Sequence, residues 1–425
     1  MKFYSTKRSV EPVSFKEAVI KGLPEDNGLF MPEYIPQLSE EFFANLNKKS
    51  IHEIGLEVAL PFVGDDISKS DLEQIVTETL NFDIPVVKVE DNIYSLELFH
   101  GPTCAFKDVG ARFLARCLSQ FSDEKVTVLV ATSGDTGSAV ANGFLGVPNV
   151  DVIILYPKGK VSHLQEQQLT TLGQNITALE VDGTFDDCQA LVKTAFLDKE
   201  LNKSIKLTSA NSINIARLIP QSFYYFWAMK QLPSDQKIVF SVPSGNYGNL
   251  TAGLLAKAMG LGIKGFVASS NANDIVPQYL NENIYKPRPS QQTISNAMDV
   301  GNPSNFGRMT ELYKQSWDDI TKDITGYSFY DGETKAAMKK VFDEKGYVLD
   351  PHGAVGYLGL KKYLKQNDYL GVFLETAHPA KFLDTVNEVI GEIEIPERLE
   401  AYLHKTKVSI PIDNDYEVLK TILKG

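Results

Sequence analysis

The sequence predicts an α/β protein whose mostly parallel sheets follow a mainly helical N-terminal segment. From about residue 95 onward, short apolar runs rich in β-branched residues alternate with helical patterns of about 10–15 residues. Such alternation implies βαβ crossovers and two open, mostly parallel sheets covered by helices. The residues before 95 show helical patterns around 15–21 and 71–80 and little strand signal. Because parallel sheets bind ligands at the carboxyl ends of their strands, we expect the site where strands lead into helices.

The expected strands lie at 94–99, 126–132, 152–156, 176–181, 238–242, 266–269 and 371–374. One of the clearest helices follows Lys107, where apolar residues recur at helical spacing and form a single stripe. Those residues are Gly110, Phe113, Leu114, Cys117, Leu118 and Phe121. Residues 284–304, which are rich in proline, serine and asparagine, are expected to form a long ordered loop over a site.

This organisation predicts three domains. We expect an N-terminal domain over 1–94 and a small α/β domain over 122–212. The small domain is inserted into a large α/β domain formed by 95–121 and 213–425. The site is expected in the cleft between the two α/β domains.

Composition excludes several classes of protein. The 425 residues are 43% hydrophobic and 23% charged, which is too apolar for a disordered chain. A net charge of −12 argues against nucleic acid as a main partner. Three cysteines form no C-x-x-C pair and predict no disulfide framework. The N-terminus lacks the apolar core of a signal peptide, and no apolar run approaches the ~18 residues of a membrane span, so we expect a cytoplasmic monomer or small homo-oligomer.

The first junction with chemical potential is the segment HGPTCAFKD, residues 100–108. Lys107 opens a helix there, although the positive end of a helix dipole disfavours a cation. That placement lowers the pKa of an amine, as a nucleophilic or Schiff-base lysine requires. The alternative is an exposed lysine that lies near a helix start by chance.

Two further junctions are suited to anions. Residues 131–137, ATSGDTG, follow a strand and offer hydroxyls and free N–H groups for a carboxylate or phosphate. The alternative is an ordinary capped helix with Ser133 or Asp135 as N-cap. Residues 244–249, SGNYGN, also lie between a strand and a helix, and their two glycines allow close approach to a phosphate. A tight Gly-Asn turn would explain them equally simply.

The fourth junction, ETAHPAKF over 375–382, follows the strand at 371–374. Thr376 lies where parallel sheets place ligand-facing groups, although alone it would be interpreted as an N-cap.

Other patterns are rejected. The G-x-G-x-x-G match at 260–265 leads from a helix into a strand, the reverse of the dinucleotide-binding order. The histidines show no metal-ligand spacing, so no metal is expected. No G-x-S-x-G elbow of a serine hydrolase is present.

A Schiff-base lysine, an anion cradle, a phosphate loop and a neutral hydroxyl together indicate a pyridoxal 5′-phosphate site. At HGPT-x-x-FKD, SGNYGN, ETAHPAKF and DNGLFMP (26–32) the chain resembles the threonine synthase family, within the fold type II enzymes that include tryptophan synthase β. The resemblance runs nearly end to end and implies the tryptophan synthase β-like fold, with the cofactor in the large domain. It begins almost at Met1, so the regulatory extension of plant-type enzymes is not expected.

The resemblance implies roles for individual residues. Lys107 would form the Schiff base and move protons, and Thr376 would bind the pyridine nitrogen. Ser133, Asp135 and Thr136 would lie against the substrate carboxylate and the 3′-oxygen of the cofactor, where many fold type II enzymes have Asn in place of Asp. The cofactor phosphate would bind Ser244, Gly245, Asn246, Tyr247, Gly248 and Asn249. The substrate phosphate would bind Ser212 and Arg217, although Arg217 could also be a surface helix residue.

The activity implied is conversion of O-phospho-L-homoserine and water to L-threonine and phosphate, a small-molecule reaction. One alternative keeps the cofactor but releases 2-oxobutyrate, ammonia and phosphate. A serine or threonine dehydratase would not need the second phosphate site at Ser212 and Arg217. A catalytically silent binding protein is disfavoured by the intact Lys107, SGNYGN and Thr376.

Overall fold

The computed structural model describes residues 1–121, 124–233 and 235–424, and its main strands form two sheets. The six-stranded sheet has the order β11 (Ile324–Ser328), β10 (Ile263–Ser270), β9 (Ile238–Pro243), β12 (Leu370–Glu375), β4 (Ile93–Glu97) and β3 (Val86–Glu90). Only the pair β3 and β4 is antiparallel among the pairs of this sheet that the described ranges contain. The five-stranded sheet has the order β13 (Ile410–Asp413), β7 (Ile176–Asp182), β6 (Val150–Pro157), β5 (Val126–Ala131) and β8 (Leu207–Ser209), and its pairs are parallel. The predicted fold class is confirmed.

The N-terminal segment is mainly helical, as predicted. Its helices are α1 (Phe15–Lys21), α2 (Glu40–Ala44), α3 (Ile51–Val63) and α4 (Lys69–Thr79), with the 3₁₀ helix η1 (Leu46–Lys48). The four α-helices begin after Ser14, Ser39, Ser50 and Ser68, whose hydroxyls each accept a backbone N–H of the first turn. The sequence does not predict the antiparallel ribbon of β1 (Phe3–Ser5) and β2 (Phe30–Pro32), because three residues show too little alternation.

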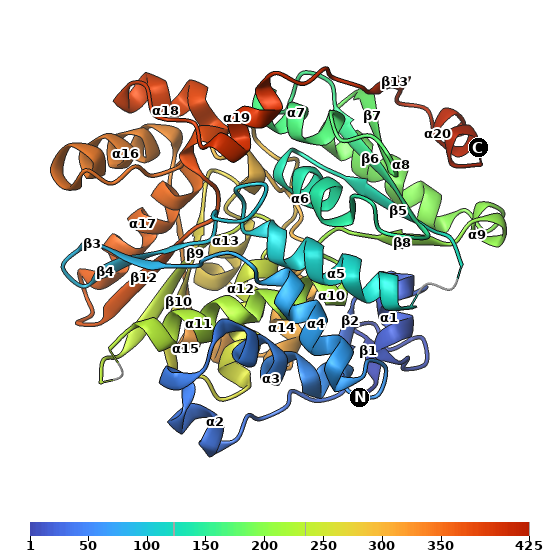
Figure 1. Ribbon diagram of the computed structural model, residues 1–425. Helices are drawn as coiled ribbons and strands as arrows, with labels where there is room; N and C mark the ends of the chain where they lie inside the picture. The colour runs from blue at the N-terminus through green and yellow to red at the C-terminus, as the bar shows by residue number, and fades with distance from the viewer. Residues whose placement is uncertain (122–123, 234, 425) are drawn as a thin grey trace.

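Helices cover the faces of both sheets (Figure 1). Those of the five-stranded unit are α6 (Asp135–Phe144), α7 (His163–Thr170), α8 (Phe185–Leu197), α9 (Leu201–Ser204) and α20 (Tyr416–Lys424). Those of the six-stranded unit include α11 (Phe223–Gln231), α12 (Gly248–Ala258), α13 (Ile275–Glu282), α15 (Trp317–Asp323), α16 (Asp331–Lys345), α17 (Pro351–Leu364) and α18 (Leu383–Ile390). The remaining helices are α5 (Lys107–Phe121), α10 (Ile215–Leu218), α14 (Phe306–Leu312), α19 (Glu397–Leu403), η2 (Ile219–Ser222), η3 (Asn296–Met298) and η4 (Pro379–Phe382).

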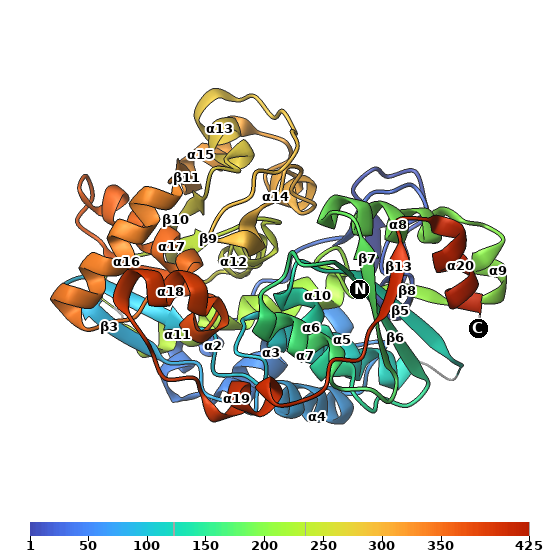
Figure 2. The same cartoon turned by 90° about the horizontal axis from the view of Figure 1, so that it is seen from above.

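The helix predicted after Lys107 is α5, and its apolar stripe is buried. It packs against α4, α6 and α10 and so lies between the N-terminal helices and the five-stranded unit. Seen from above, the two sheet units lie side by side, with β9, β10 and β11 in one and β5, β6 and β7 in the other (Figure 2). This arrangement places Lys107, the first residue of α5, close to both units.

Strand pairing departs from the predicted domain limits in two places. Strands β3 and β4 belong to the six-stranded sheet, so the large unit begins before residue 95. The C-terminal strand β13 pairs with β7 of the five-stranded sheet, and α20 packs against α8. The expectation that 213–425 lies wholly in the large domain is therefore wrong for its last segment. Because β13 is short and mostly exposed, it carries no alternation that would assign it to a sheet from sequence. We propose the division into three domains with these two changes.

Within the described ranges, no helix combines the length and apolar character that crossing a bilayer requires.

A buried arginine connects the N-terminal segment to the loop before α10. Arg308 on α14 is 0% exposed, and burial lowers its pKa to about 9. Its guanidinium donates hydrogen bonds to the carbonyl oxygens of Phe30, Ser212 and Ile213 at distances of 3.0, 3.1 and 2.6 Å. This one side chain therefore holds β2 beside the segment that contains Ser212.

The substitution Arg308→Met should lower the free energy of unfolding by about 3 kcal/mol, because it removes the guanidinium donors of the Phe30 and Ile213 carbonyl oxygens. Urea denaturation followed by circular dichroism measures the change. The matched control is Arg8→Met, since Arg8 forms a 2.6 Å ion pair with Glu311 while 65% of its side chain is exposed. That control should leave the midpoint nearly unchanged. Equal midpoints for the two variants would contradict this role of Arg308.

Candidate active site

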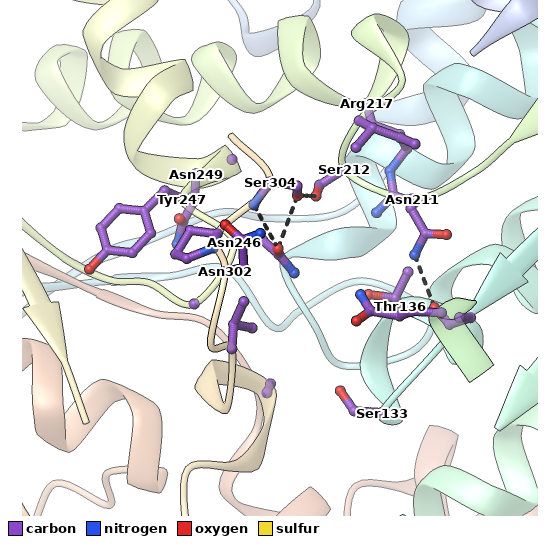
Figure 3. A pocket seen from close by; sticks show the side chains of 18 of the residues that line it. Ser133, Thr136, Asn211, Ser212, Arg217, Asn246, Tyr247, Asn249, Asn302 and Ser304 are labelled. Atoms are coloured by element: carbon purple, nitrogen blue, oxygen red, sulfur yellow. Dashed lines mark hydrogen bonds between the residues drawn. The ribbon is translucent and has the colours of Figure 1, made fainter. Parts of the chain in front are cut away.

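A cavity of about 580 Å³ lies at the carboxyl ends of the parallel strands, between the two sheet units. It brings together residues that are far apart in the sequence (Figure 3). The predicted site residues that line it are Lys107, Ser133, Asp135, Thr136, Ser212, Arg217, Gly245, Asn246, Tyr247, Gly248, Asn249 and Thr376. Ser244 does not line the cavity; its hydroxyl donates to Asn249 Oδ1 at 2.7 Å and supports the loop from behind.

The Lys107 amine has no hydrogen bond and no ion pair with any residue of the described ranges. Burial lowers its pKa to about 8, against the effect of the Asp135 carboxylate, and the cations Arg217 and Lys381 lower it further. The turn before Lys107 is fixed, because the Phe106 N–H donates to the Thr376 carbonyl at 2.8 Å. This amine therefore loses its proton far more readily near neutral pH than an ordinary lysine, as a nucleophile or base must.

The loop 244–249 exposes a run of backbone donors. From Gly245 to Asn249, the N–H groups donate to no acceptor in the part of the chain that the structure describes, whereas the next N–H, that of Leu250, donates to Asn249 Oδ1. Tyr247 lies in the left-handed region with φ 61°, which turns successive N–H groups toward one side. These donors stand at the start of the 11-residue helix α12, so dipole and hydrogen bonds together favour an anion.

Position 245 requires glycine because the backbone of another loop packs closely against it. A methyl group at its Cα would lie 2.8 Å from the Met298 Cα atom and 3.0 Å from the Ala297 carbonyl oxygen. Both atoms belong to the loop that the sequence predicts over the site, and residues of this loop from Tyr285 to Ser304 line the cavity. The 284–304 loop therefore packs directly on the anion cradle.

Asn246 and Ser304 connect the cradle to the far side of the cavity. Asn246 Oδ1 accepts hydrogen bonds from the Ser304 hydroxyl at 2.9 Å and from its N–H at 3.2 Å. The Ser304 hydroxyl lies 3.4 Å from that of Ser212 (Figure 3). Ser212 and Ser304 thus lie between the 245–249 cradle and Arg217.

Arg217 on α10 is a buried cation at this far side. It is 3% exposed, and burial lowers its pKa to about 10. Its guanidinium donates to the Ala210 carbonyl oxygen, whereas Nε is buried and has no partner among the described residues. The interpretation of Arg217 as a surface helix residue is wrong, because α10 packs against α5 and η2 and buries the side chain. Nε lies against Gly110 of α5, but Arg217 lines the cavity, and a buried guanidinium there is suited to a second anion.

The segment 131–137 starts α6, but neither Ser133 nor Asp135 is its N-cap. Gly134 is the N-cap residue, with φ 135°, and the Thr132 hydroxyl oxygen accepts the N–H of Gly134 at 2.9 Å and that of Gly137 at 2.8 Å. Ser133 and Thr136 therefore keep their side chains on the cavity wall.

Asp135 is held as a carboxylate. Burial favours its neutral form, but the cations Lys381 and Lys107 reverse that effect and hold its pKa well below the usual range. Its Oδ1 atom accepts hydrogen bonds from Lys381 Nζ at 2.7 Å and from Gln165 Nε2 at 2.9 Å. This buried pair joins α6 of the five-stranded unit to η4, which follows β12 of the six-stranded sheet.

Thr376 follows β12 and is 6% exposed. It does not cap a helix; the N-cap of η4 is His378, whose ring Nδ1 accepts the Ala380 N–H at 3.1 Å. In the described ranges the Thr376 hydroxyl makes no hydrogen bond with protein, so it is available to a ligand in the cavity.

Several cavity residues are not singled out by the sequence. They are Gln221, His352, Asn302 and Ser304, and the buried Lys381 acts on the same cavity through Asp135. Asn302 and Ser304 could have been found from the composition of the 284–304 loop. His352 follows the N-cap Asp350, which accepts its ring Nδ1–H at 2.6 Å, and no local pattern distinguishes it from an ordinary helix-start histidine.

Comparison with known proteins gives matches over the whole chain. Residues 2–80 match the family model "Threonine synthase N terminus", 79–373 match "Pyridoxal-phosphate dependent enzyme", and 353–423 match "Threonine synthase, C-terminal". Threonine synthase of Haemophilus influenzae is 47% identical over 427 residues, covering 100% of this chain and 99% of that protein.

Solved structures of threonine synthases also match over the whole chain. The crystal structure of threonine synthase from Escherichia coli superposes with a TM-score of 0.94 at 44% identity, covering 100% of this chain and 99% of the other. The structure of pyridoxal-phosphate-bound threonine synthase from Brucella melitensis superposes with a TM-score of 0.92 at 35% identity, again over 100% and 99% of the two chains.

The cradle can be tested with inorganic phosphate. The substitution Gly245→Ala should weaken phosphate binding about tenfold or more, because the added methyl group forces the cradle and the 284–304 loop apart at a strain of about 1–3 kcal/mol. Isothermal calorimetry on protein freed of bound small molecules measures the dissociation constant. In Gly262→Ala the methyl group meets nothing within 4 Å, so this control should bind as the parent does. Equal weakening in both variants would contradict the assignment.

Proposed function

The chain belongs to the threonine synthase family of pyridoxal-phosphate-dependent enzymes, and on that basis we propose that its cavity converts O-phospho-L-homoserine and water to L-threonine and phosphate. The observation that carries the proposal is the combination in one cavity of the partner-free Lys107 amine with the five free N–H groups of 245–249. The chain is a lyase of threonine biosynthesis, and its substrate is a small molecule.

The residues present fit the cofactor. An amine without a partner, a cradle of N–H donors and a free hydroxyl match the aldehyde, phosphate and ring nitrogen of pyridoxal phosphate, respectively. We assign Lys107 to the aldehyde carbon, Gly245, Asn246, Tyr247, Gly248 and Asn249 to the phosphate, and Thr376 to the ring nitrogen. Ser244 supports Asn249 through its hydroxyl rather than by direct contact with the cavity.

When bound, pyridoxal phosphate supplies a conjugated ring that takes up the electron pair left at the substrate Cα. Lys107, whose pKa is lowered to about 8, removes the Cα proton once the substrate amine has displaced it. Loss of a Cβ proton would then let phosphate leave from Cγ. Cγ would take up a proton, water would add at Cβ, and Lys107 would return the proton to Cα to complete threonine. The Thr376 hydroxyl, unlike a carboxylate, leaves the ring nitrogen largely unprotonated, which restrains the negative charge at Cα and disfavours transamination.

The substrate is held at both ends. Ser133 and Thr136 offer hydroxyls to its carboxylate, together with the free N–H groups at the start of α6. Asp135 also lines the cavity, but its carboxylate is already paired with Lys381. We therefore assign it a position near the 3′-oxygen of the cofactor rather than a contact with the substrate. Arg217 and Ser212 hold the substrate phosphate, which a serine or threonine dehydratase would not need.

We further propose that the enzyme acts in the cytoplasm as a monomer or small homo-oligomer, without a nucleic-acid or membrane partner. The net charge of −12 supports the absence of nucleic-acid and membrane partners, because an acidic surface repels phosphate backbones and anionic headgroups.

Product analysis tests the activity. Purified protein should be yellow and should release phosphate and threonine from O-phospho-L-homoserine in equal amounts. Lys107→Ala should lose both the colour and turnover, because the other lysine that lines the cavity, Lys193, is exposed rather than buried at the ends of the strands. Absorbance spectra with parallel assays of phosphate, threonine and 2-oxobutyrate measure this. Phosphate accompanied by 2-oxobutyrate would establish the alternative lyase, and colour with turnover in Lys107→Ala would overturn the lysine assignment.

Arg217 is tested separately from the cofactor. Arg217→Met should lower kcat/KM about 10–100-fold, because it removes charge-assisted hydrogen bonds worth about 1.5–3 kcal/mol. The absorbance of bound cofactor should be unchanged. Arg217→Lys keeps the charge but loses the planar fork, so it should recover only part of the loss. Steady-state kinetics with the phosphorylated substrate provide the measurement, and an unchanged kcat/KM in Arg217→Met would contradict the assignment.

A further inference from the structure

Lys381 is a buried cation to which the family resemblance gives no role. It lies on η4, five residues after Thr376, and its side chain is 0% exposed. Nζ donates to Asp135 Oδ1 at 2.7 Å and to the Thr103 carbonyl oxygen at 3.0 Å. The Thr103 residue precedes Lys107 in the same turn, and its N–H and hydroxyl donate to Asp108 at 2.9 and 2.5 Å. Lys381 therefore contacts both the carboxylate on α6 and the segment that carries the reactive lysine.

Three charged groups act on the Lys107 amine, one anion and two cations. The charged groups that act on its amine are Asp135 from α6, Arg217 from α10 and Lys381 from η4. The other titratable side chains of the cavity are Lys193, Tyr247, Tyr285 and His352. Asp135 is the anion of this set, and the two cations that act on it are Lys381 and Lys107. The Asp135 carboxylate forms its ion pair with Lys381, and within the described ranges it forms none with Lys107.

We propose that Lys381 is a positioning residue, which keeps the Asp135 carboxylate in a buried ion pair and thereby prevents that carboxylate from pairing with the Lys107 amine. A buried anion without a partner would attract the nearest available proton or cation. If Lys381 were neutral, that cation would be Lys107, which would be held in its charged, unreactive form. With Lys381 in place, the pair has no net charge and Lys107 can lose its proton.

The arrangement around the pair supports this role. Gln165 donates to the same Asp135 oxygen at 2.9 Å, and Gln168 donates to the Thr103 carbonyl oxygen at 3.3 Å. Both glutamines come from α7, so three elements converge on the pair and fix its geometry. Asp135 stands where many fold type II enzymes have Asn, which brings a negative charge close to the Schiff-base lysine. Lys381 compensates that charge in this chain.

This inference rests on the assignment of Lys107 as the reactive amine, but its test does not require turnover. Full-length protein is freed of cofactor and labelled with trace acetic anhydride from pH 6 to 10, and the acetylation of Lys107 is quantified by mass spectrometry. The exposed Lys199 serves as an internal reference. The pH dependence gives the pKa of the Lys107 amine directly, which a merely structural role of Lys381 would not change.

Lys381→Met should raise the pKa of Lys107 by about one unit or more, because an unpaired carboxylate nearby favours the ammonium form. Labelling at pH 7 should then slow about tenfold or more relative to the parent. Lys381→Arg keeps the cation and should restore the parent value. The double variant Lys381→Met/Asp135→Asn removes both charges at similar volume and should also return close to it.

An unchanged Lys107 pKa in folded Lys381→Met would overturn the proposal, as would a raised pKa that persists in the double variant. If Lys381→Met fails to fold by near-ultraviolet circular dichroism, Asp135→Asn decides the question. That variant leaves the Lys381 cation without its anion, so the Lys107 pKa should fall and labelling at pH 7 should become faster. A rise or no change in Asp135→Asn would overturn the proposal. A chain that labels as expected but makes no threonine would refute the proposed activity and leave the role of Lys381 intact.

Discussion

The site depends on a geometric constraint of parallel sheets, which bring the carboxyl ends of all their strands to one edge. Helices that follow those strands begin with N–H groups that have no acceptor within the helix. In this molecule the ends of β5, β9 and β12 face one cavity, so anion-binding donors and the Lys107 amine meet there. The 284–304 loop closes over the cradle because Gly245 has no side chain to hold it away.

The second requirement concerns the charges of the groups that line the cavity. The cavity takes a cofactor phosphate, a substrate phosphate and a substrate carboxylate, yet its lysine must be neutral to react. Arg217 and the N–H groups of 245–249 supply positive potential without a mobile proton, since a guanidinium stays charged even when its pKa falls to about 10. Burial then lowers the pKa of Lys107 to about 8. The Asp135 carboxylate on the same wall is paired with Lys381 at 2.7 Å, and we propose that this pairing keeps it from holding a proton on that amine.

Hydrogen bonds also hold the two sides of the cavity at a defined distance from each other. Arg308 fixes the carbonyl groups of Ser212 and Ile213, and Ser304 connects Ser212 to Asn246 in the cradle. A shift of one unit relative to the other would therefore change the distance between Ser212 and the 245–249 cradle. The buried pair of Asp135 and Lys381 joins the units beside the reactive lysine, so orientation and charge are controlled at the same place.

Local patterns in the sequence predict the α/β class, the seven strands of the expected alternation, the helix after Lys107 and the junctions that line the cavity, because these depend on periodicity and turn chemistry. The sequence did not determine the position of β13, which is too short and exposed to show a pattern and is assigned only by its pairing with β7. It also did not reveal that Ser244 turns away from the cavity, that Gly134 caps α6, or that Lys381 pairs with Asp135 across 246 positions of sequence. Those features are contacts between distant segments, and only the packing of the two sheets decides them.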